Sequence, residues 1–178
     1  CYGTTIIINM SELTTLIKVN GNTIEFEWVD LNEGWNISEY SPVTQAYGIC
    51  MDEQGKVCLI KGKKLGSNWC LPGGTVEAGE TLIQTLIREV DEEADIEIED
   101  ISFLGLQKVT KNNVFDCYQS RWVARISKIK EQTADPDKGY ILTREFVEWD
   151  KSIKMLSWGP VADKFFEKAK QIMFAPRN

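Results

Sequence analysis

A short glycine-rich segment runs directly into one amphipathic helix, and this combination constrains the fold more than any other part of the chain. The segment from Gly73 to Glu80 contains three glycines and precedes a helix expected from about Thr81 to Ala94. At about 100° per residue, six apolar side chains of this helix fall within an arc of about 140° and predict a buried stripe. They are Leu82, Ile83, Leu86, Ile87, Val90 and Ala94. The glycines allow a tight turn whose backbone groups can approach a ligand closely.

Three glutamates of this helix are spaced so that they share one face. Glu89, Glu92 and Glu93 stand at i, i+3 and i+4, and Glu93 projects at the edge of the apolar stripe. Carboxylates at the edge of a core are costly unless a cation neutralises them, and Arg88 cannot balance all three. Oxygen-only ligands suit a hard divalent ion such as Mg²⁺ or Mn²⁺. The pattern predicts a metal–phosphate site, with a solvated acidic helix face as the alternative.

The stretch from Gly74 to Ile96 resembles the signature of the Nudix hydrolase family. Five residues separate Gly74 from Glu80, and seven more lead to Arg-Glu-Val-x-Glu-Glu-x-x-Ile, which begins at Arg88. A chance match of the polar positions is on the order of one in a million in a chain of this length. One position departs, because Asp95 replaces the usual glycine. Since Asp adopts left-handed conformations more readily than most residues, we expect the backbone turn to survive.

The resemblance implies an α/β fold, a Nudix-type α/β/α sandwich with a mixed β-sheet, in a Nudix hydrolase domain over residues 42–178. The Trp-x-Leu-Pro-Gly-Gly run that ends at Gly74 also resembles the family. The remaining pattern predicts strands at 43–51, 56–61, 101–109, 114–126 and 140–149, a loop at 130–139 and a closing helix at 160–174.

Residues 1–41 lie outside the resemblance and predict an N-terminal β-rich extension. Two strand-like runs, Thr14–Val19 and Thr23–Trp28, flank Asn20-Gly21, which is a strong β-hairpin signal. Such an extension either covers the site or builds a homodimer, and the sequence leaves both open.

The resemblance also implies roles for the signature residues. Nudix enzymes typically hydrolyse a nucleoside diphosphate linked to another group, using one or more Mg²⁺ or Mn²⁺ ions. The implied metal ligands are Glu89, Glu92, Glu93 and the carbonyl of Gly73. Glu89 acts either as a ligand or as the general base, while Arg88 and Glu80 hold the glutamates and the loop in place. A distal acid often completes such sites; we prefer Glu145 over Glu148 because it stands a few residues before a Trp, with an exposed strand acid as the alternative.

Several further side chains have a simple structural explanation beside a functional one. Lys61, Lys63 and Lys64 either contact substrate phosphate or occupy a solvated turn. The aromatic residues Tyr47, Trp69 and Phe115 could stack on a base, but core packing is the expected role of such side chains. The run 135–139 begins like an EF-hand loop but lacks its glycine and its final glutamate, so we expect a plain loop.

Composition excludes several classes of function. The 178 residues include no histidine, which removes Ser-His-Asp hydrolases and His-ligated zinc sites. A net charge of −7 argues against a nucleic-acid partner bound through a broad basic face, and so against RNA 5′-end processing. No apolar run approaches the ~18 residues that span a membrane. Five scattered cysteines without a CxxC pair predict buried reduced thiols and a cytoplasmic protein.

Together these patterns predict a Mg²⁺-dependent hydrolase of phosphorus-containing anhydrides, with Mn²⁺ as a substitute. It would cleave a diphosphate linkage in a small-molecule substrate, a nucleoside di- or triphosphate derivative. The alternative is a catalytically idle Nudix domain that acts as a nucleotide-binding sensor or interaction module. The nucleobase, the leaving group and the number of metal ions stay open.

Overall fold

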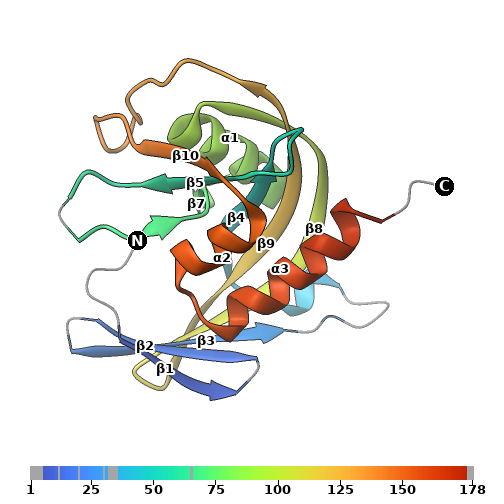
Figure 1. Cartoon of the computed structure of the whole chain (residues 1–178). Helices are drawn as coiled ribbons and strands as arrows, with labels where there is room; N and C mark the ends of the chain where they lie inside the picture. Colours follow the sequence, from blue (N-terminus) through green and yellow to red (C-terminus); the bar gives the residue numbers. More distant parts are fainter. Residues whose placement is uncertain are drawn as a thin grey trace.

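Ten described strands form one mixed sheet, and helices cover both of its faces (Figure 1). The computed structural model describes residues 6–11, 13–19, 21–29, 31, 36–64 and 66–175. The strands are β1 (Ile6–Ser11), β2 (Thr14–Val19), β3 (Asn22–Val29), β4 (Val43–Met51), β5 (Val57–Lys61), β6 (Trp69–Cys70), β7 (Gly73–Thr75), β8 (Ile96–Lys111), β9 (Val114–Ile129) and β10 (Thr143–Val147). The helices are α1 (Leu82–Ala94), α2 (Trp149–Leu156), α3 (Pro160–Met173) and the 3₁₀ turn η1 (Ile37–Glu39). The strand order is β1-β2-β3-β8-β9-β4-β5-β10, with β6 paired to β5 and β7 paired to β4.

Two apolar clusters hold the helices on opposite faces of the sheet. Helix α1 packs on one face through Leu86 and Val90, and helices α2 and α3 cover the other face, where Phe165 and Phe166 are fully buried. Strands β4 and β9 run parallel, whereas the other pairings between described strands are antiparallel. The predicted α/β/α sandwich with a mixed sheet is therefore confirmed.

Strand β4 changes partner along its length, and this change makes room for the glycine segment. Near its end, Met51 pairs with Val57 of β5. Nearer its start, residues 45–47 pair instead with β7, which contains both glycines of the predicted loop. The glycine segment is therefore in part a short strand, fixed by backbone hydrogen bonds to the centre of the sheet.

The N-terminal extension forms the predicted hairpin and continues the same sheet. Strands β2 and β3 pair antiparallel, and β3 then pairs with β8; Asn20 of the predicted turn lies outside the described residues. Ile17, Phe26 and neighbouring apolar side chains bury Val109 and Cys117 at the far end of the β8–β9 hairpin. The described strands of the extension thus widen the sheet beyond β8, and a homodimer stays a prediction.

Two contacts attach the extension firmly to the rest of the molecule. Trp28 packs against Gly105, where an added Cβ would lie 2.6 Å from the indole ring. The Thr15 hydroxyl is buried and donates a hydrogen bond to the Trp158 carbonyl at 2.9 Å, between α2 and α3. A Gly105 side chain would therefore displace the extension from β8.

The predicted strand at 140–149 is wrong at its ends. Strand β10 covers only Thr143–Val147, and Trp149 begins helix α2, which the sequence analysis missed. Trp149, Ile153 and Leu156 have helical spacing, but Glu148 at the N-cap makes no side-chain capping hydrogen bond. Because no capping residue marks the start of this helix, the sequence from Tyr140 to Trp149 resembles one longer strand.

The predicted apolar stripe of α1 is wrong at two positions. Ile83 and Ile87 are 42% and 45% exposed. The buried face includes Thr85, Glu89 and Glu93 instead. Helix α1 is therefore rotated relative to its apolar stripe, so that two carboxylates face the glycine strand β7.

The cysteines agree only in part with the expectation of reduced thiols. Cys50, Cys58 and Cys117 are buried and free, and burial raises the pKa of the Cys58 thiol to about 12. Cys70 is disulfide-bonded, so the expectation fails there.

None of the helices in the described part of the chain has both the length and the hydropathy that a membrane-spanning helix needs. The cytoplasmic location stays a prediction.

We expect Phe165→Ala to destabilise the protein by about 3–5 kcal/mol, because the ring is fully buried and its loss leaves a cavity under α3. Ile172→Ala on the same helix is the matched control, since that side chain is 38% exposed and its loss should change stability by about 0.5 kcal/mol or less. Urea unfolding measures both. Equal effects would contradict the assignment of Phe165 to the core.

Candidate active site

The ends of α1 are fixed by local hydrogen bonds that the sequence supplies. At the start, the Thr81 hydroxyl accepts from the Gln84 backbone N–H while the Gln84 side chain accepts from the Thr81 N–H, which is a capping box. At the end, Asp95 takes the left-handed conformation at φ 48° and ψ 50°, as predicted for this replacement of the usual glycine. Both ends of helix α1 are therefore fixed, and with them the positions of its glutamates.

Glu89, Glu92 and Glu93 of the signature are called the box glutamates below, and two of the three lie directly against the glycine strand β7. The Gly73 N–H donates to Glu93 Oε2 at 2.9 Å. An added Cβ at Gly74 would come within 2.4 Å of Glu89 Oε1. At Gly73 an added Cβ would lie 2.2 Å from the Ala46 carbonyl oxygen. Both glycines are thus required because sheet and carboxylates press on β7 from two sides.

Arg88 is the cation at the centre of the acidic helix. It donates to both oxygens of Glu80 at 2.8 and 3.1 Å, to Glu89 at 3.0 Å and to Glu92 at 2.9 Å. A further bond at 3.0 Å reaches the Thr75 carbonyl at the end of β7. One guanidinium therefore connects Glu80 and two of the box glutamates to the end of the glycine strand.

Glu80 is held in its charged form. Besides Arg88, it accepts hydrogen bonds from the Thr85 hydroxyl at 2.8 Å and the Glu77 N–H at 3.1 Å. These donors, the Arg88 hydrogen bond foremost, lower the pKa of Glu80 to about 2. Glu80 is thus a permanent anion that positions Arg88, as the family resemblance implies.

A second cation, which sequence analysis missed, neutralises Glu93. Lys138 lies on the loop between β9 and β10 and donates from Nζ to Glu93 Oε1 at 2.9 Å and to Asp135 Oδ2 at 2.6 Å. This loop was expected to be plain, and nothing in the spacing of 135–139 pointed to the helix. Forty-five residues separate Lys138 from Glu93, so only the fold brings them together.

The carboxylates of Glu89 and Glu93 are close enough to influence each other. Burial raises the pKa of Glu89, and the negative charge of Glu93 raises it further. Burial also raises the pKa of Glu93, and the Gly73 N–H and Lys138 oppose this shift. Two buried acids side by side favour the arrival of a cation.

The donor set fits a hard divalent cation. Within the part of the chain that the structure describes, no three cysteine or carboxylate side chains converge tightly enough to hold an ion in this conformation. The donors of Glu89 and Glu93 are nevertheless all oxygen, and in this conformation the two acids pair with two protein cations, Arg88 and Lys138. Glu89 and Glu93, which lie against the glycine strand β7, are thus suited to Mg²⁺ or Mn²⁺.

The structure does not bring Glu145 together with the box glutamates. Its neighbours in β10, Arg144 and Phe146, face α1, since Arg144 donates to the Ala94 carbonyl and Phe146 packs in the α1 cluster. Strand alternation places Glu145 on the opposite face, where it is exposed. Glu148 is also exposed, at the N-cap of α2.

The candidate base-stacking residues lie in three different settings. Tyr47 is half-buried under the Arg121 guanidinium, 4.7 Å from the ring centre, and Trp69 packs against the core with Lys61 over its ring at 5.6 Å. Phe115 is 41% exposed, so the expectation of core packing is wrong there. It lies near the tip of the β8–β9 hairpin, where side chains point away from the core.

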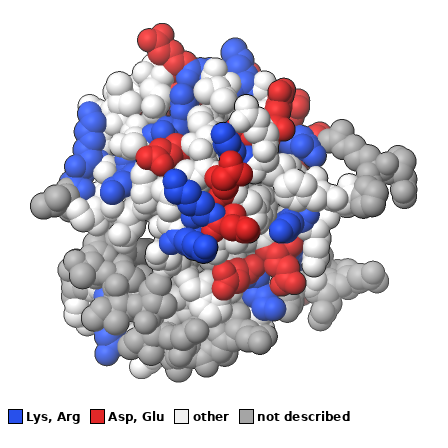
Figure 2. Space-filling view, in the orientation of Figure 1, with Lys and Arg blue, Asp and Glu red and all other residues white. Residues whose placement is uncertain are grey.

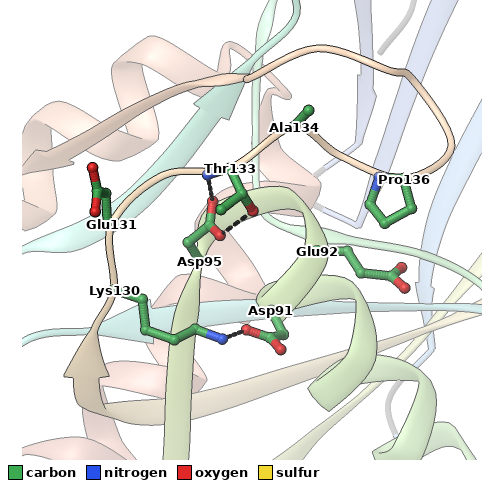
Figure 3. Close-up of a pocket in the computed structure, with 8 residues that line it drawn as sticks. All are labelled: Asp91, Glu92, Asp95, Lys130, Glu131, Thr133, Ala134 and Pro136. Carbon is green, nitrogen blue, oxygen red and sulfur yellow. Dashed lines mark hydrogen bonds and ion pairs between the residues drawn. The ribbon is translucent and has the colours of Figure 1, made fainter.

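A hollow of about 310 Å³ lies at the C-terminal end of α1, between the helix and the β9–β10 loop (Figure 3). Asp95 accepts hydrogen bonds from the Thr133 N–H at 3.1 Å and the Thr133 hydroxyl at 2.8 Å, and Lys130 pairs with Asp91. Glu92 lies on the wall of this hollow. On the face of the molecule seen in Figure 1, basic and acidic side chains of the described residues are interspersed (Figure 2).

Comparison with known proteins gives one family. The family model described as NUDIX domain matches residues 41–169. Over 62 residues the chain is 37% identical to human and 34% identical to mouse "8-oxo-dGDP phosphatase NUDT18". These matches cover 34% of this chain and 19% of each relative, so the matched segment spans about a fifth of their length.

Solved structures show the same fold. A mutant of the Bacillus subtilis pyrophosphohydrolase BsRppH superposes with a TM-score of 0.61 at 23% identity, covering 86% of this chain and 94% of that one. An Ap4A hydrolase complex from C. elegans gives 0.54 at 18% identity over 72% of this chain and 96% of that one. A NUDIX hydrolase from Nitrosomonas europaea gives 0.55 at 18% identity, over 72% and 88%.

We expect Glu80→Gln to remove a pH-dependent part of the stability. A carboxylate whose folded pKa is lowered from 4.5 to about 2 stabilises the fold fully above about pH 4.5, and this contribution is lost as the pH falls through about 2. Urea unfolding from pH 7 to about 2.5 should therefore show wild type and variant converging as the pH falls. Glu77→Gln, an exposed carboxylate of the same loop, is the control. A constant difference across this range would contradict the Glu80–Arg88 assignment.

Proposed function

Because the chain belongs to the Nudix family, we propose that it is a divalent-metal-dependent pyrophosphohydrolase that cleaves a diphosphate linkage in a nucleoside di- or triphosphate derivative. The observation that carries this proposal is the contact of Glu89 and Glu93, on helix α1, with Gly74 and Gly73 of strand β7. There the box glutamates lie beside the backbone of β7 and form ion pairs with Arg88 and Lys138.

The proposed metal ligands are the box acids and one backbone group: Glu89, Glu92, Glu93 and the Gly73 carbonyl. These residues would hold Mg²⁺ or Mn²⁺, which when bound would supply charge neutralisation for the phosphates and a water molecule of lowered pKa. We leave Glu145 out of this set because of its place on the opposite face of the sheet.

The chain's own residues position these ligands. Arg88 fixes the rotamers of Glu89 and Glu92, and the charged Glu80 fixes Arg88 through two hydrogen bonds. Orientation of this kind lowers the entropy cost of assembling the reactive geometry. The Glu89 carboxylate lies against Gly74 and accepts a hydrogen bond from Arg88, and we keep both of its proposed roles, metal ligand and general base.

The relatives narrow the substrates worth testing. The similar proteins include an 8-oxo-dGDP phosphatase, an Ap4A hydrolase and a pyrophosphohydrolase. All three names support a phosphoric anhydride as the bond that is cleaved, and the first two support a nucleotide. Oxidised guanine nucleotides therefore stand first in the panel, followed by dinucleoside polyphosphates and nucleoside diphosphate derivatives.

We expect metal-dependent cleavage of at least one compound in a panel of canonical and 8-oxo nucleotides, Ap4A, ADP-ribose, NADH and nucleotide sugars. Chromatography of the products with Mg²⁺ or Mn²⁺ present gives the rate and the bond that is broken. Glu89→Gln and Glu93→Gln should each lower the rate about 100-fold or more while the melting temperature stays close to that of wild type.

Glu145→Gln is the matched control, since it makes the same chemical change on the opposite face and should keep the wild-type rate. Full activity in both box variants would contradict the assignment of the site. No turnover by the wild type, together with a rise in melting temperature on adding a nucleotide, would instead favour an idle binding module.

A further inference from the structure

The ion pair between Lys138 and Glu93 joins the box helix to a loop that lies outside the family signature. Lys138 Nζ is 2.9 Å from Glu93 Oε1 and 2.6 Å from Asp135 Oδ2. The other oxygen of Glu93 accepts from the Gly73 N–H. Arg88 donates hydrogen bonds to Glu80, Glu89 and Glu92, and its described contacts do not include Glu93. Neutralisation of the most buried box acid thus depends on Lys138.

The loop is built to place this lysine. Asp135 is only 3% exposed, and its Oδ1 accepts the backbone N–H groups of Asp137 and Lys138 at 2.9 and 2.8 Å. Its carbonyl accepts from the Gly139 N–H at 2.8 Å, which closes the turn. Asp135 thus fixes both the backbone and the ammonium group of Lys138.

A second anchor fixes the loop to the end of α1. Asp95 receives two hydrogen bonds from Thr133 through its side chain, and its carbonyl accepts from the Lys130 N–H at 2.9 Å. The usual glycine at position 95 would have no side chain for the first two bonds. This chain has therefore coupled the end of the box helix to the loop that carries Lys138.

An ammonium group and a divalent cation compete for one carboxylate. Coulomb repulsion between them is strong at contact distance in a partly buried site, so Glu93 cannot pair closely with both. Lys138 is 38% exposed in its side chain, and its long stem lets the ammonium move while Asp135 keeps the loop in place.

We propose that Lys138 is a built-in counter-ion of Glu93 which the catalytic metal displaces. It is a positioning residue: it holds Glu93 against Gly73 before the metal arrives, and it weakens metal binding because it must leave. This inference rests on the proposed function, since it takes Glu93 to be a metal ligand.

The test is the dissociation constant of Mn²⁺ alone, measured from the EPR signal of free Mn²⁺ without any substrate. Lys138→Met should bind Mn²⁺ about threefold or more tightly than wild type, because the competing charge is gone. Lys138→Arg keeps the charge and should remain close to wild type. Lys130→Met removes the same charge from the same loop, where it pairs with Asp91 rather than with a box glutamate, and should change the constant much less.

The outcomes separate this inference from the proposed function. Glu93→Gln should weaken Mn²⁺ binding about tenfold or more; an unchanged constant would overturn Glu93 as a ligand, and the proposed metal site with it. If Glu93→Gln weakens binding but Lys138→Met leaves it unchanged or weaker, the counter-ion role is overturned, because a purely structural lysine would act in that direction. Equal tightening in Lys138→Met and Lys130→Met would overturn it as well, since net charge alone would then explain the effect.

Discussion

The contact of two glutamates with a two-glycine strand is the constraint on which the rest of the site depends. Gly74 leaves only enough room for the Glu89 carboxylate, and the Gly73 N–H fixes Glu93. To reach β7, helix α1 must turn its carboxylates inward. This rotation exposes the two isoleucines that its apolar pattern would bury, so local hydrophobicity yields here to the geometry of the site.

Carboxylates that are buried side by side require positive charge nearby. The chain supplies one cation from the same helix and a second from a residue far away in the sequence. Arg88 comes from the same helix and binds three acids with one planar group. Lys138 comes from a loop and binds the remaining one. The first cation is part of the permanent scaffold, because its bonds to Glu80 keep it in place. The second stands on a half-exposed side chain, which suits a role that ends when another cation arrives.

The parts of the site that could be predicted from the sequence are those encoded locally. Helical spacing brings Glu89, Glu92 and Glu93 to one face, and Asp95 takes the left-handed turn expected from its residue type. Lys138 could not be predicted, because its contact with Glu93 arises only from the return of the chain through β8 and β9.

The alternation of side chains along strand β10 and the missing cap of helix α2 explain two further differences between the expected and the observed structure. The position of Glu145 in the sequence suggests a distal ligand, but the face to which it points depends on which neighbours pack against α1. Helix α2 lacks a side-chain cap at Glu148, so nothing in the sequence separates it from the strand before it. By contrast, Asn20-Gly21 is a turn signal and Pro160 is a residue type that suits the first turn of a helix, and both predicted elements are present.

The family match begins at residue 41, but the sheet continues beyond it. Strand β8 is 16 residues long, and β3 covers its outer edge from Leu106 to Lys111. Without β3, the stretch of β8 from Leu106 to Lys111 would offer a row of unpaired backbone donors and acceptors to other strands. Strand β3 therefore takes up the backbone hydrogen-bonding groups of this part of β8: a chain shortened to the family match would keep every signature residue and would leave that stretch of β8 unpaired.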